Sequence, residues 1–168
     1  RIFTPVEERP YAGVPVLAMA FALTDAGRVP LGEDRTEVRL ELAAGLVCAA
    51  VARDANGRSE IALTSLPPVF DAPIEPALVL PSLGLAPDRT ANGAPVQVVS
   101  TGTRQLLICL QTIGDVTAVQ LSIGALAALR QAHDFASLRV FCLGGYTPIG
   151  DCFGRHFFAG RDGVNEDP

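Results

Sequence analysis

The chain has 168 residues, of which 49% are hydrophobic and 18% are charged. This length fits one ordinary domain or two small lobes, and the hydrophobic share excludes a disordered protein. The net charge is −5 at pH 7, and the 13 cationic side chains, all of them arginines, are scattered singly. We therefore expect no nucleic-acid partner, because such surfaces need clustered cations. We expect no membrane partner either, because no apolar run reaches the roughly 20 residues that span a bilayer.

The first segment, RIFTPV, predicts a strand over residues 1–6, with a turn after it. Gly13, Val14 and Pro15 then open an apolar helix that stops before Gly27, as expected for proline in a first turn and glycine past a helix end. Apolar residues surround this helix, which predicts a central helix buried on all sides with a sheet wrapped about it. The chain starts with Arg1 in mid-strand rather than with Met, so we expect an internal piece of a longer protein.

A meander of antiparallel strands should follow the helix, because polar and apolar residues alternate there. Its predicted strands are 36–42, 46–53 and 59–66. Six prolines between residues 67 and 87 indicate a boundary near residue 70. We therefore expect a first lobe over 1–70, incomplete at its N-terminus, and a second lobe over 71–168, incomplete at its C-terminus.

The second lobe repeats this plan loosely. Its main helix is predicted over 117–132, where Val119, Ile123, Leu126 and Leu129 share one face and Thr117 serves as the N-cap. A short helix is expected within 78–85. The predicted strands are 96–100, 105–111, 138–143 and 155–159.

Several kinds of chemistry find no support in the sequence. It has no GxGxxG or Walker loop and no GxSxG elbow, and without lysine it cannot form a lysine Schiff base. His133 is expected to be a surface or helix-capping residue, and His156 a structural residue of a strand. The four cysteines, 48, 109, 142 and 152, form no CxxC pair, so we expect no metal site. Without a disulfide framework or secretory signal, the expected location is the cytoplasm.

Two places remain as candidate sites. The corner Ala12-Gly13-Val14-Pro15 could bind an anion through free N–H groups at the helix start, or it could need glycine and proline for geometry alone. The end, Gly163 to Pro168, could carry a carboxylate poised for proton transfer, or a polar helix start in which Asp167 precedes Pro168. The residues by themselves favour the structural interpretation at both places.

The stretches RIFTPVEERPYAGVPVLAMAFAL, VQVVSTGTRQLLICL and GRHFFAGRDGVNEDP resemble, in order and spacing, the PhzF family of phenazine-biosynthesis-like isomerases. The resemblance implies an α+β fold like diaminopimelate epimerase. In that fold two lobes each place a curved, mostly antiparallel sheet around a central helix, and the site lies in the cleft between them. It also implies cofactor-free acid–base proton transfer on a small carboxylate-bearing substrate, and a homodimer.

Carried over by this resemblance, Asp167 matches the family's catalytic Asp and Gly13 matches the glycine whose backbone faces the substrate. Glu8 matches the Glu before that turn, and Val14 stands where the family pattern has His. Valine cannot exchange a proton. The family's principal catalytic Glu would lie upstream of Arg1, and its ATGSA substrate-binding turn would follow the C-terminal end of this sequence.

Three hypotheses therefore stay open. In the first, the chain belongs to an isomerase or epimerase with altered chemistry. In the second, it belongs to a catalytically inactive relative that binds a ligand or serves as a partner subunit, and in the third it is an unrelated cytosolic domain. We favour the first, because general acid–base catalysis can survive with a Glu and an Asp alone. The loss of a titratable group at Val14 argues for the second, and the three separated motifs argue against the third.

Overall fold

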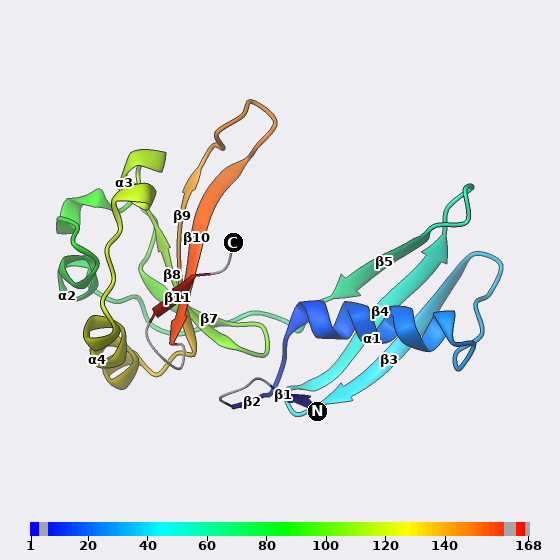
Figure 1. The fold of residues 1–168 in the computed structure, drawn as a ribbon. Coiled ribbons are helices and arrows are strands. Elements are labelled where there is room, and N and C mark those ends of the chain that lie inside the picture. Colours follow the sequence, from blue (N-terminus) through cyan, green and yellow to red (C-terminus); the bar gives the residue numbers. More distant parts are fainter. Residues whose placement is uncertain (4–6, 160–163, 167–168) are drawn as a thin grey trace. The chain divides into compact units, whose positions relative to one another are not determined.

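The computed structural model describes residues 1–3, 7–159 and 164–166. It divides into two compact units, Arg1–Pro67 with Thr101–Thr103 and Pro68–Ser100 with Arg104–Pro168. Each unit combines helices with strands and has its own hydrophobic core, so the fold is α+β (Figure 1).

The first unit is built on an antiparallel meander in the order β3-β4-β5, as the alternation predicted. On β3, Val38 and Leu40 point into the core while Glu37, Arg39 and Glu41 are exposed, so one face of the sheet meets solvent. A separate two-stranded ribbon pairs β1 with β2. The strands are β1 (Ile2–Phe3), β2 (Glu8–Arg9), β3 (Arg35–Leu42), β4 (Gly45–Arg53) and β5 (Ser59–Thr64).

Helix α1 (Gly13–Asp25) lies along the other face of this sheet (Figure 1). Its buried residues, Val16, Ala20 and Thr24, recur every fourth position and form one stripe. The side chains of Val14 and Phe21 are 78% and 44% exposed. The prediction of a helix buried on all sides is therefore wrong within the described residues, because a three-stranded sheet on one side covers only one face of a helix.

The second unit contains a six-stranded sheet in the order β11-β10-β9-β8-β7-β6. Its neighbours are antiparallel except β8 and β9, which run parallel. Parallel neighbours need a crossover connection, and α3 and α4 occupy that connection. The strands are β6 (Val69–Phe70), β7 (Gln97–Ser100), β8 (Arg104–Cys109), β9 (Ser137–Leu143), β10 (Cys152–Ala159) and β11 (Val164–Glu166).

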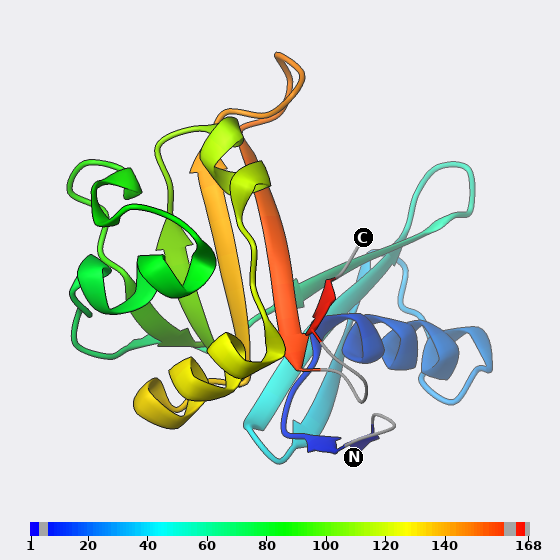
Figure 2. The ribbon, with the colours of Figure 1, turned by 60° about the vertical axis from the view of Figure 1, so that its left-hand side comes forward.

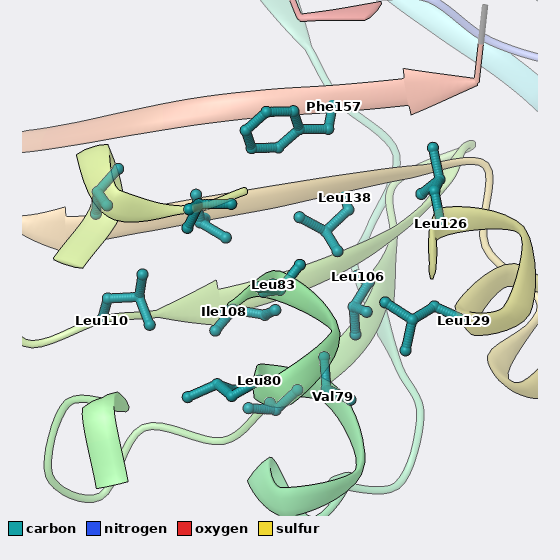
Figure 3. Close-up of a cluster of buried hydrophobic side chains, with 14 of the residues drawn as sticks. Val79, Leu80, Leu83, Leu106, Ile108, Leu110, Leu126, Leu129, Leu138 and Phe157 are labelled. Carbon is teal, nitrogen blue, oxygen red and sulfur yellow. The ribbon is translucent and has the colours of Figure 1, made fainter. Parts of the chain in front are cut away.

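The helices of this unit pack on one side of its sheet, as Figures 1 and 2 show. They are α2 (Pro76–Val79), α3 (Ile113–Ala118) and α4 (Ile123–His133), with 3-10 turns η1 (Leu80–Leu83) and η2 (Pro87–Arg89). Figure 3 shows Leu80 and Leu83 of η1 and Leu126 of α4 facing Leu106 and Leu138 of the strands. All five side chains are fully buried, so the core of this unit lies between helices and sheet.

One predicted helix, over 117–132, has the wrong bounds. The chain forms α3 and α4 instead, with a break between them. The hydroxyls of Thr112 and Ser122 each accept a backbone N–H three residues on and serve as N-caps. Thr117, predicted as the N-cap, lies inside α3, where its hydroxyl donates to the carbonyl of Gly114.

Candidate functional site

The start of α1 is a helix end without a side-chain cap. Ala12 precedes it in extended conformation (φ −154°, ψ 129°), the alanine side chain cannot accept a hydrogen bond from the first turn, and no acidic residue lies in that turn. Pro15 has no N–H, so the first turn offers the N–H groups of Gly13 and Val14. These donors and the positive end of the helix dipole suit a carboxylate or another anion.

Gly13 is not required by the conformation of this corner. Its φ lies outside the left-handed region, and a Cβ built on it would meet Leu63 Cδ2 at 3.7 Å and Tyr11 Oη at 3.8 Å. Both are ordinary van der Waals distances, so alanine would fit among the residues that the structure describes. The interpretation that geometry alone demands glycine here therefore fails for Gly13, and close approach of a ligand to the backbone remains as an explanation.

Val14 carries the most exposed side chain of α1's larger apolar residues, at 78%. It lies in the same first turn as the N–H groups of Gly13 and Val14. A ligand bound there would meet an apolar surface that can neither give nor take a proton.

A turn from far along the chain holds the residue that leads into α1. The hydroxyl of Thr103 donates to the carbonyl of Tyr11 at 2.8 Å. Gly102 has a φ of +111°, and a Cβ on it would lie 2.9 Å from Tyr11 Cβ and Cγ. This contact was not predicted from the sequence, although the glycine in Thr101-Gly102-Thr103 did indicate a turn.

Glu8 lies on β2, where its backbone pairs with Phe3 of β1. The Arg1 guanidinium hydrogen-bonds its carboxylate and holds the pKa of that carboxyl below its usual value. Glu8 is therefore an ionised, solvent-facing partner of Arg1, and its role toward a substrate stays a prediction.

Asp167 lies outside the described residues, so the structure gives no account of this candidate. The residue before it, Glu166, ends β11 and pairs with Phe157 of β10. Arg155 donates to the Glu166 carboxylate through Nε at 2.7 Å and through Nη2 at 2.8 Å. These hydrogen bonds, together with the charge of Arg155, lower the pKa of the Glu166 carboxyl. This ion pair was also missed, because nothing in the sequence indicated that β10 and β11 pair.

The remaining titratable groups are spread over the fold. His133 ends α4, and the His156 ring packs near Phe158 in β10, at 5.9 Å between centroids. The four cysteines are free thiols, and burial raises the pKa of the Cys109 thiol. Within residues 1–3, 7–159 and 164–166, no three His, Cys, Asp or Glu side chains gather into a metal-binding group. No helix in that part of the chain is long and apolar enough to cross a membrane.

Comparison with known proteins decides the family. The model of the family described as phenazine biosynthesis-like proteins, PhzC-PhzF, matches residues 1–168. The chain belongs to the PhzF family. It is 31% identical to trans-2,3-dihydro-3-hydroxyanthranilate isomerase of Pseudomonas aeruginosa, over 99% of this chain and 53% of the relative. It is 30% identical to an uncharacterized isomerase, YddE, of Salmonella typhimurium, over 78% of this chain and 43% of that protein.

This PhzF-family chain thus spans about half the length of the curated relatives it matches. Solved structures show the same fold. A PhzF-family protein from Bacillus anthracis superposes with a TM-score of 0.69 at 21% identity, over 94% of this chain and 52% of that one. A hydroxyproline epimerase from Agrobacterium vitis gives a TM-score of 0.61 at 18% identity, over 96% of this chain and 48% of that one. The predicted fold, α+β and diaminopimelate epimerase-like, is confirmed.

Proposed function

We propose that the protein is an isomerase or epimerase that moves a proton on a small carboxylate-bearing metabolite without a cofactor. The observation that carries this proposal is the uncapped start of α1, at a glycine that the fold does not require. The N–H groups of Gly13 and Val14 would hold the substrate carboxylate. Relatives named as an isomerase and an epimerase support proton transfer as the reaction.

In this proposal Asp167 exchanges the proton. The second acid or base is the family's Glu, which family members carry upstream of the segment that matches Arg1. Two such groups must differ in pKa so that one donates while the other accepts. Glu8 would help to bind the substrate or shape its site. We further propose that the protein acts in the cytoplasm as a homodimer.

The Gly13→Ala variant of the full-length protein tests the carboxylate site. The added methyl fits sterically and favours helix, so the free energy of unfolding should stay equal or rise by about 0.5–1 kcal/mol. The methyl would crowd a ligand at the backbone, so kcat/KM should fall about tenfold or more. Deuterium uptake by a substrate panel in D2O, including trans-2,3-dihydro-3-hydroxyanthranilate and hydroxyproline, measures turnover.

Gly124→Ala is the matched control. Gly124 is also in the first turn of a helix, α4, and among the described residues a Cβ there would meet only Ser122 Oγ, at 4.0 Å. It should change stability in the same way and leave turnover unchanged. Full activity in Gly13→Ala would contradict the proposed carboxylate site.

The second candidate is a relative without catalytic activity that binds a ligand or serves as a partner subunit. Val14 favours it, since the family's proton-exchanging His is replaced by an exposed apolar side chain. The Val14→His variant separates the two. A gain of deuterium exchange would support the isomerase, whereas no exchange across the panel by either protein would favour the binding function.

A further inference from the structure

We propose that Arg155 is a positioning residue that fixes the end of β11, from which the chain enters Asp167. This inference rests on the proposed function, which makes Asp167 the proton-exchanging group. Arg155 itself touches neither substrate nor reacting atoms in this scheme; it acts through Glu166.

The contacts of Arg155 use its whole guanidinium. Nε and Nη2 bind the two carboxylate oxygens of Glu166 side by side, at 2.7 and 2.8 Å. Such a bidentate pair fixes orientation as well as distance, which a lysine could not do. The side chains are only 22% and 39% exposed, so solvent screens the pair less than it screens an ion pair in open water.

The other nitrogen, Nη1, anchors Arg155 to the helical layer. It donates to the carbonyls of Val116, Thr117 and Val119 at 3.1, 3.2 and 3.1 Å. These carbonyls lie at the C-terminal end of α3, where the helix leaves carbonyls without internal partners. The positive charge also suits the negative end of the helix.

The ring of Phe157 completes the arrangement. Arg155 Cζ lies 4.8 Å from its centroid, and Phe157 is the residue of β10 that pairs with Glu166. One arginine therefore joins α3, β10 and β11. Because β11 has three residues and lies at the edge of the sheet, backbone pairing alone gives it little support. The arginine contacts hold it in register.

The test uses Glu166→Gln and Arg155→Lys in the full-length protein. Glu166→Gln keeps the side-chain shape and leaves the arginine bound to α3. Arg155→Lys keeps the positive charge but loses the bidentate contact with Glu166. The matched control is Glu37→Gln, which removes the exposed pair of Glu37 with Arg39, whose side chains are 52% and 69% exposed. Hydrogen exchange by mass spectrometry, which needs no substrate, is measured together with kcat and KM.

We expect amides 164–166 to exchange about tenfold faster in Glu166→Gln, with α4 and β3–β5 unchanged. The same variant should lower kcat about tenfold with KM within about twofold, because alignment of the reacting group is lost while binding is kept. Arg155→Lys should fall between wild type and Glu166→Gln in both readouts. Glu37→Gln should alter neither.

The outcomes separate the positioning role from its alternatives. Faster exchange without loss of kcat overturns it, since the contact would then be merely structural. Loss of kcat with unchanged exchange also overturns it, because Glu166 would then act directly. If wild type turns over no substrate, the proposed function fails, and unchanged exchange in Glu166→Gln would show independently that Arg155 does not hold β11.

Discussion

At the scale of single residues, two glycines near the start of α1 differ in whether the fold tolerates a Cβ at their position. Gly13 has room for a Cβ among the described residues, so folding does not require glycine at this position. Gly102 has no such room, because its φ of +111° is in the left-handed region and Tyr11 lies against it. A sequence shows both simply as glycine. Only the surrounding atoms distinguish a glycine that folding needs from one that a ligand could need.

Gly102→Ala should lower the free energy of unfolding by about 1–3 kcal/mol, because backbone strain and a 2.9 Å contact with Tyr11 add together. Chemical denaturation measures this. Gly57→Ala is the control. The φ of Gly57 is +77°, but no atom in the described part of the chain lies within 4 Å of an added Cβ, so only strain of about 1 kcal/mol is expected. Equal losses in the two variants would show that the Tyr11 contact is not tight in solution.

At the scale of elements, local signals located the strands better than the helices. Alternation of polar and apolar residues placed β3, β4 and β5 within two residues of their ends, because the pleat itself has that period. The helical pattern over 117–132 missed the break before α4. Apolar spacing continues across the break, whereas the capping bonds of Thr112 and Ser122 interrupt the helix.

Thr112→Ala and Ser122→Ala should each destabilise the protein by about 1 kcal/mol, because each leaves an N–H at a helix start without its partner. Thr117→Ala, which removes a hydroxyl bonded within α3, should stay within about 0.5 kcal/mol of wild type. Urea denaturation followed by circular dichroism gives all three values. A larger loss in Thr117→Ala than in Ser122→Ala would instead support one continuous helix beginning at residue 117.

The apolar pattern of helix α1 did not predict which of its faces is buried. Its apolar residues on all sides predicted burial on all sides, yet the described sheet buries only the stripe through Val16, Ala20 and Thr24. An apolar surface favours burial, but its residues do not show which other element will cover it.

At the scale of the whole molecule, two separate cores imply two units that respond separately to damage. Leu106 belongs to the core of the second unit and Val51 to that of the first, and both are fully buried. Leu106→Ala should destabilise its own unit by about 2–5 kcal/mol. Hydrogen exchange should then quicken in β7–β9 while β3–β5 keep their protection, and Val51→Ala should do the reverse.

Equal loss of protection in both units after either substitution would contradict this, and would mean that the units unfold as one. The sequence predicts two lobes, over 1–70 and 71–168, and the same exchange data would test that division.

The sequence by itself determined the family and the type of fold. Three separated motifs and the strand alternation suffice for these, since each is carried by residues near one another in the chain. The tertiary structure decided which face of α1 is buried, that Thr103 holds Tyr11, and that Arg155 joins α3 to Glu166. Partners so far apart in sequence leave no local pattern, because what brings them together is the pairing of strands and the packing of helices on a sheet.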